Sequence, residues 1–134
     1  MANSPAQWLE LAQGDLVGAE ILAVHARADS RLAAQLFSAS VEKAIKGAIA
    51  LAGQQPDFIH DIAALGRRAS ALGMSPPIDL AIAQRLSIHA TLFRYTPAGG
   101  PERHRVDLPA YGDAARAWVN WVADLIAAAT PAAP

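Results

Sequence analysis

The chain has 134 residues, which is enough for one domain with a single core and too few for two. Apolar types make up 53% of it, but 32 residues are alanine, the best helix former, so the composition argues against an all-β fold. There is no cysteine, which excludes disulfide bonds, thiolate metal sites and cysteine nucleophiles.

The net charge of −1 is unevenly distributed along the chain. Residues 1–29 contain four acidic residues and one arginine, whereas residues 60–105 contain six arginines against three acidic residues. This asymmetry suits an anionic ligand or an acidic face on a partner, although the same charges could simply be scattered over a solvated surface.

No segment is predicted to target or span a membrane. The first ten residues have no positive charge and no apolar run, so they do not resemble a signal peptide. The longest uncharged stretches are far shorter than the roughly 20 residues that a spanning helix needs. We therefore expect a cytoplasmic protein without a membrane segment.

Two long helices are predicted in the first half of the chain. Ser4, Pro5 and Gln7 form a helix start with a serine cap, a proline at the first position and a glutamine three residues after the cap. The apolar spacing that follows predicts a helix over about residues 5–28. Asp29 and the next residue offer a second cap, and a helix over about 30–53 ends at Gly53.

Three further helices are predicted in the second half. A short helix covers about residues 59–72, and a fourth opens at residues 75–77 and ends before the Pro/Gly-rich residues 96–101. The last helix covers about 108–128, and residues 129–134 are expected to form a flexible tail.

These elements predict an all-α fold in one domain, residues 1–134, with its core within about 5–128. The expected architecture is an antiparallel up-and-down helical bundle of four long helices plus one short helix. Because large apolar residues are few, part of the stability is expected to come from a second chain, and a homodimer is the default.

Two short segments concentrate charged residues. Glu42 and Lys46 are four residues apart with the acid first, which predicts an ion pair on the solvated surface of a helix. His60 and Asp61 lie near the start of the third helix, where an acidic residue complements the helix dipole, so a capping role is predicted.

The order of these segments resembles the HEPN domain, the higher-eukaryote and prokaryote nucleotide-binding family. The resemblance rests on Trp8, Ala12 and Asp15, then on residues 41–46, then on residues 60–65, and it covers about residues 8–125. The segment from Arg94 through Tyr95 to Pro97 also resembles the Arg-Tyr-Pro segment of the prokaryotic branch of that family.

The resemblance implies an all-α bundle, a homodimer, and in many members a neighbouring small nucleotidyltransferase in a toxin–antitoxin type of pair. Active members are metal-independent ribonucleases. Their signature is an arginine, four to six intervening residues and a histidine, with two such motifs meeting across the dimer.

This chain lacks that signature. The nearest pair is Arg85 and His89, with three residues between them, which a helix would place on one face. Two hypotheses follow. The first is a non-catalytic module that binds nucleotide or RNA, or pairs with a nucleotidyltransferase; the alternative is a divergent ribonuclease that uses Arg85 and His89 at a dimer cleft. No metal and no cofactor are expected.

The candidate phosphate-binding residues come from the basic part of the chain. Arginine guanidinium groups bind phosphate oxygens in pairs, and tyrosine can stack on a base. An equally open interpretation is that Arg94 and Tyr95 hold a loop against the bundle. Two further arginines, at 67 and 68, are expected on a solvated face. Trp118 and Trp121 have the spacing of core residues. The candidates are Arg85, His89, Arg94, Tyr95, Arg103 and Arg105.

Overall fold

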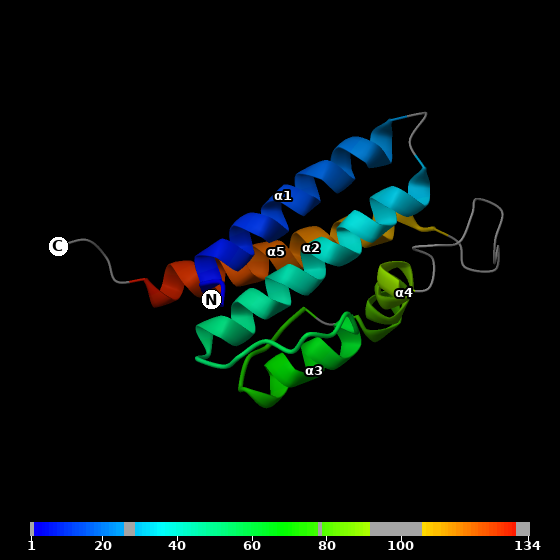
Figure 1. The fold of residues 1–134 in the computed structure, drawn as a ribbon. Coiled ribbons are helices and arrows are strands. Elements are labelled where there is room, and N and C mark those ends of the chain that lie inside the picture. Colours follow the sequence, from blue (N-terminus) through cyan, green and yellow to red (C-terminus); the bar gives the residue numbers. More distant parts are fainter. Residues whose placement is uncertain (1, 26–28, 78, 92–105, 131–134) are drawn as a thin grey trace.

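The computed structural model of the chain describes residues 2–25, 29–77, 79–91 and 106–130. Within these ranges the protein is all-α, with five helices and no strand (Figure 1). This confirms the predicted fold class. The helices are α1 (Pro5–Val24), α2 (Ser30–Leu51), α3 (Ile62–Ala71), α4 (Leu80–Thr91) and α5 (Leu108–Ala129).

Local signals fix most helix ends. The Ser4 hydroxyl accepts a hydrogen bond from the Gln7 backbone N–H at 3.1 Å, and the Gln7 side chain accepts one from the Ser4 N–H at 2.8 Å. Asp29 caps α2 and Asp61 caps α3 through their carboxylates. A side-chain hydrogen bond from Arg31 holds the pKa of Asp29 below its usual value.

Two glycines end helices in the left-handed region. Gly53 follows α2 with φ at +79°, and Gly73 follows α3 with φ at +87°. Glycine adopts this conformation without the steric penalty of a Cβ, so each one turns the chain away from its helix.

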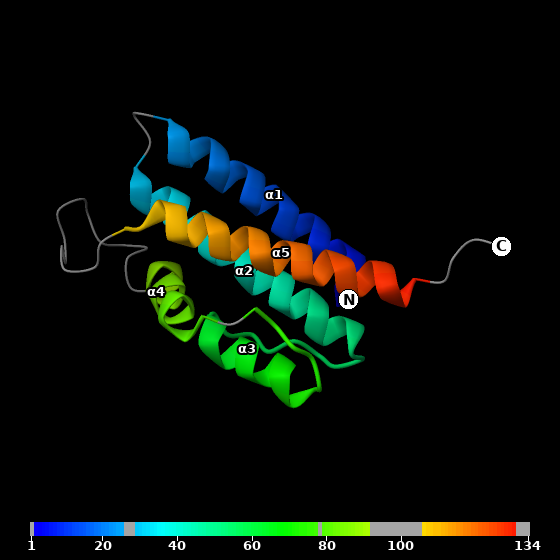
Figure 2. The same cartoon turned by 180° about the vertical axis from the view of Figure 1, so that it is seen from behind.

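The three long helices α1, α2 and α5 each pack against the other two, and the shorter α3 and α4 lie beside them (Figures 1 and 2). α1 runs antiparallel to α2, but α2 and α5 run in the same direction, as the colours in Figure 1 show. α3 and α4 pack on the other side of α2, and α4 is seen nearly end-on in both views. The expected bundle of four long helices is therefore not confirmed, and the expected up-and-down alternation is not found.

The direction of α3 explains the broken alternation. Residues 52–61 carry the chain back along α2 before α3 begins, so α3 runs in the same direction as α2 (Figure 1). An up-and-down bundle needs a short turn between helices, and this connection is a long return instead.

α2 is the central helix and contacts all four others. Alanine side chains at 0% exposure line much of its surface, which lets the neighbouring helices approach closely. Two serines tie α4 into the core: the Ser38 hydroxyl donates to the Leu86 carbonyl at 2.7 Å, and the Ser87 hydroxyl accepts from the Ile62 N–H at 2.9 Å. The described helices share this one core. None of them combines the length and the apolar character that crossing a membrane would require.

Candidate functional site

A buried ion pair lies in the middle of α2. Lys46 Nζ donates to Glu42 Oε2 at 3.0 Å, and only 8% of the lysine side chain and 11% of the glutamate side chain are exposed. The predicted ion pair is confirmed, but its predicted place on a solvated surface is wrong. α2 is surrounded by neighbours, so the face that carries this pair is covered by α1 and by residues 52–61.

His60 completes a three-residue charge cluster with this pair. Its Nδ1 lies 2.6 Å from Glu42 Oε1, so the buried carboxylate is shared between an ammonium group and an imidazole. The remainder of the His60 ring is turned outward, since 54% of the side chain is exposed. We refer to Glu42, Lys46 and His60 as the charge cluster.

Further contacts fix residues 52–61 against α3. Asp57 pairs with Arg68 at 2.9 Å, and Asp61 accepts from the Ala64 N–H at 3.1 Å. The Asp61 contact confirms the predicted helix cap. Arg68 was expected to be solvated, but it holds this connection in place instead.

Trp8 brings α1 to the charge cluster. The Lys46 ammonium lies 5.8 Å from the centroid of the Trp8 ring, which is the geometry of a cation–π contact. The Trp8 indole N–H is buried and donates to no acceptor within the described residues. A second contact between the same two helices is the ion pair of Lys43 on α2 with Asp15 on α1.

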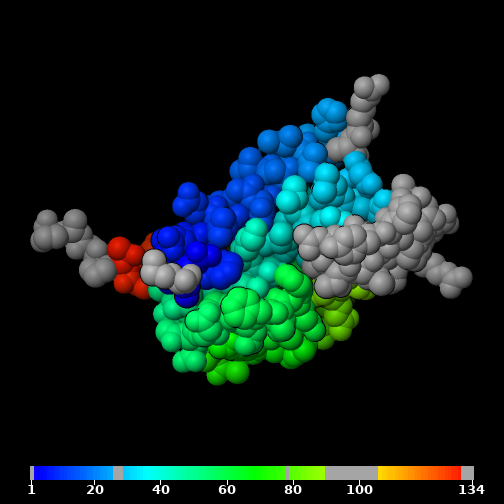
Figure 3. Space-filling model, viewed as in Figure 1, coloured from blue at the N-terminus to red at the C-terminus, as the bar shows by residue number. Residues whose placement is uncertain are grey.

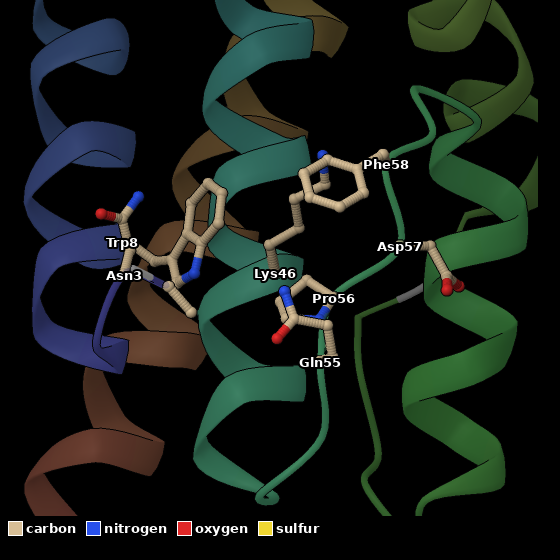
Figure 4. A pocket seen from close by; sticks show the side chains of 8 residues that line it. Asn3, Trp8, Lys46, Gln55, Pro56, Asp57 and Phe58 are labelled. Carbon is tan, nitrogen blue, oxygen red and sulfur yellow. The ribbon is translucent and has the colours of Figure 1, made fainter.

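A pocket of about 390 Å³ opens beside Trp8 and Lys46 (Figure 4). In that view Lys46 rises from α2 between Trp8 on α1 and Phe58 on the connection to α3. The Phe58 side chain is 93% exposed, which is unusual for a large aromatic residue. The pocket is lined by Ala2, Asn3, Trp8, Lys46, Gln55, Pro56, Asp57 and Phe58.

The structure separates the two candidates on α4. Arg85 is exposed, whereas His89 is 1% exposed and lies in the core against α5. His89 Nε2 is 3.3 Å from the Tyr111 hydroxyl oxygen, and the two rings meet edge to face at 5.3 Å. Burial raises the pKa of Tyr111, and the Arg85 charge opposes part of this effect.

The spacing of four residues is therefore a poor guide to a shared surface here. Arg85 and His89 lie close together around α4, but the border between its exposed and its buried side runs between them, so Arg85 is exposed and His89 packs against α5. A buried imidazole of this kind has the surroundings of a core histidine.

The other predicted phosphate-binding residues, Arg94, Tyr95, Arg103 and Arg105, lie outside the described residues. Trp118 is buried and Trp121 half-buried, with ring centroids 5.5 Å apart, so the prediction that they belong to the core is confirmed.

The sequence profile of the HEPN domain matches residues 6–125. The chain belongs to the HEPN family. A comparison with curated proteins and one with solved structures returned no match.

Three segments separated in the HEPN sequence meet at this site. Trp8 comes from α1, Glu42 and Lys46 from α2, and His60 from the segment before α3. The sequence analysis named all four of these residues. It did not name Phe58, whose place at the site is evident only from its exposure beside the pocket. Among the described side chains, no group of three or more potential metal ligands is close enough to hold an ion.

Proposed function

We propose that this HEPN chain is a non-catalytic module that binds a nucleotide, or a base of an RNA strand, in the pocket between Trp8 and Phe58. The observation that carries the proposal is the pocket itself, with an exposed aromatic ring, a tryptophan and an ammonium group on its wall. Every base has an aromatic face, so aromatic side chains stack on bases with little dependence on sequence.

The polar groups of the pocket suit the edge of a base or a ribose. Lys46 carries three N–H groups, of which one is directed at Glu42. Asn3 and Gln55 add amide groups that can donate or accept. A nucleobase presents acceptors and donors on one edge, which matches this mixture.

The charge of the pocket favours a base over a phosphate as the buried part of the ligand. Lys46 is already neutralised by Glu42, and Asp57 by Arg68. We propose that the phosphates of a longer strand instead contact arginines within residues 60–105, among them the exposed Arg85. His89 is left out of this set because it is buried.

Titration calorimetry with the four nucleoside monophosphates and with short RNA oligonucleotides tests the proposal. Phe58→Ala should weaken binding by roughly 5- to 150-fold, the range of about 1–3 kcal/mol that stacking on one base contributes. Ile59→Ala is the matched control, because Ile59 is the next residue and does not line the pocket. Equal affinities for Phe58→Ala and the wild type, or no binding of any nucleotide, would contradict the proposal.

The alternative, a divergent ribonuclease using Arg85 and His89, is disfavoured by the burial of His89. A general base must come within hydrogen-bond reach of the proton that it removes, and this imidazole is enclosed by α4 and α5. We expect RNA to remain intact on incubation without metal. Cleavage that is lost in a folded His89→Ala variant would revive the alternative.

The family resemblance supports a second part of the proposal, which concerns partners. We propose that the chain forms a homodimer and pairs with a small nucleotidyltransferase, in the manner of toxin–antitoxin pairs of the prokaryotic HEPN branch. Co-expression with the product of the neighbouring gene, followed by mass measurement of the purified complex, tests the pairing. A chain that purifies alone under these conditions would contradict it.

A further inference from the structure

The imidazole of His60 is held on one side by a buried carboxylate and is open on the other (the space-filling view of this face is Figure 3). Its Nδ1 lies 2.6 Å from Glu42 Oε1, and the second oxygen of Glu42 accepts from Lys46 at 3.0 Å. A carboxylate paired with an ammonium group is ionised and can only accept, so Nδ1 carries a proton in this contact. In the neutral ring Nε2 then has a lone pair and can bind a proton.

A second cavity lies beside this imidazole. It has a volume of about 300 Å³ and is lined by His60, Glu42 and Lys43 together with side chains from the first half of α2. Glu42 contacts Lys46, and Lys46 in turn lines the pocket proposed above to hold a base, which we call the base pocket. The base pocket and the second cavity therefore lie next to each other along α2, with the ion pair between them.

The connection to α3 and α2 run side by side in opposite directions, so His60 lies one step beyond the base pocket. Lys46 and Phe58 line the base pocket, and Figure 4 shows both there. One turn back along α2, Glu42 faces His60, which is two residues after Phe58. One turn of helix rises about 6 Å at 1.5 Å per residue. His60 is therefore within reach of a phosphate that is joined through a ribose to a base in the base pocket.

We propose that His60 binds the phosphate of the nucleotide whose base occupies the base pocket, and that the imidazole takes up a proton as the phosphate binds. The inference rests on the nucleotide binding proposed above and deepens it, because it makes a phosphorylated nucleotide the preferred ligand over a nucleoside. The oxygens of a phosphate dianion only accept hydrogen bonds. Since Nδ1 already donates to Glu42, Nε2 must supply the donor, and it can do so only when it is protonated.

The charges around the ring suit an imidazolium ion. Among the described side chains, the charged groups that face it are Glu42, which Lys46 neutralises in part, and Lys43, whose ammonium group pairs with Asp15 on α1. The neighbouring Asp61 is engaged as the cap of α3. Nδ1 and Nε2 lie on different sides of the ring, so the phosphate is held away from the Glu42 carboxylate. An imidazolium ion between a carboxylate and a phosphate is attracted to both.

Titration calorimetry with a nucleoside and with its 5′- and 3′-monophosphates tests the proposal, at about pH 7.5, where a phosphate monoester is mostly a dianion. The 5′- or the 3′-monophosphate should bind about tenfold more tightly than the nucleoside, or better, since hydrogen bonds between charged groups are the strong ones. Calorimetry in two buffers with different enthalpies of ionisation measures proton uptake. We expect uptake of up to one proton when the monophosphate binds and none when the nucleoside binds.

His60→Gln is the test variant, because its amide can replace the hydrogen bond to Glu42 but cannot take up a proton at this pH. The variant should bind the nucleoside as the wild type does, lose the preference for the monophosphate and take up no proton. His25→Gln is the matched control, because His25 follows the C-terminal end of α1, whereas Trp8 lies in its first turn. This variant should keep both the preference and the proton uptake of the wild type.

The possible outcomes separate this inference from the proposed function. Equal affinities of the wild type for the nucleoside and both monophosphates, or a preference that survives His60→Gln, would overturn the phosphate site and leave the base pocket standing. A preference without proton uptake would overturn the role of the imidazolium ion. Loss of nucleoside binding in His60→Gln would show that His60 only supports the base pocket, and would overturn the inference as well. A wild type that binds neither nucleoside nor nucleotide would overturn both proposals.

Discussion

Glu42 is the residue on which the charge cluster depends, because its two oxygens face two different side chains. One oxygen accepts from Lys46, and the other lies against His60. Removing one partner of a buried ion pair leaves the other charge without compensation, which costs more than the pair contributes on its own. The cluster therefore links α2 to residues 52–61, and through Lys46 to Trp8.

A double-mutant cycle measures this dependence. Glu42→Gln should lower the free energy of unfolding by about 3 kcal/mol, because Lys46 remains buried beside a neutral amide. Glu42→Gln combined with Lys46→Met should cost less than the sum of the two single changes, by about 1 kcal/mol or more. Asp124→Asn, an exposed change on α5, serves as the control. Additive effects of the two changes in urea unfolding would show that the pair is not coupled.

Tyr111 provides a pH-dependent test of core packing. Burial raises the pKa of its phenol, so the folded state keeps the proton more strongly than the unfolded chain, in which tyrosine titrates near pH 10. The stabilisation is complete below about pH 10 and is lost as the pH rises further. In urea unfolding between about pH 9.5 and 11.5, wild-type stability should fall more steeply than that of Tyr111→Phe, by at most about 1.4 kcal/mol per pH unit, the limit for one proton. Parallel pH profiles would contradict the burial of this hydroxyl.

Among the elements, α1 and α2 are the most closely packed pair, and Gly47 is where they approach. A Cβ at this position would lie 3.1 Å from Trp8 Cβ and 3.5 Å from the Pro5 carbonyl oxygen. Neither atom belongs to the free end of a flexible side chain, so α1 would have to move. The pocket depends on this contact, because the same movement would displace Trp8.

Two glycine-to-alanine changes test the contact. Gly47→Ala should destabilise the protein by about 1 kcal/mol, since overpacking outweighs the gain in helix propensity. Gly112→Ala is the matched control on α5, because its nearest neighbour is the flexible end of Arg116. That change should be neutral or stabilising by up to about 1 kcal/mol. A Gly47→Ala protein as stable as Gly112→Ala in urea unfolding would contradict the close packing.

For the whole molecule, the sequence was a good guide to local features. Ser4, Asp29 and Asp61 cap helices, and Gly53 and Gly73 end them, because each acts through neighbours a few residues away. The direction of α3 was not predictable in this way, because it depends on how the chain packs against α2, which no short window of sequence encodes.

At the candidate site too, the sequence predicted local contacts but not which side chains are buried. The spacing of Glu42 and Lys46 predicted their contact but not their burial, because a period of 3.6 residues does not say which faces of a central helix are covered. Arg85 and His89 have the same spacing, and one is exposed while the other lies in the core. Phe58 carries no sequence signal, since its importance arises from exposure beside a pocket built by three segments.

The central claim, that the pocket beside Trp8 holds a nucleobase, has one most direct test. The chain has three tryptophans, and each gives a separate indole N–H signal in a ¹⁵N–¹H spectrum, with the Trp8 signal assigned by its loss in Trp8→Phe. On titration with a nucleoside monophosphate, the account predicts that the Trp8 indole signal shifts while those of Trp118 and Trp121 stay in place. A saturating nucleotide that leaves the Trp8 signal unmoved would contradict it.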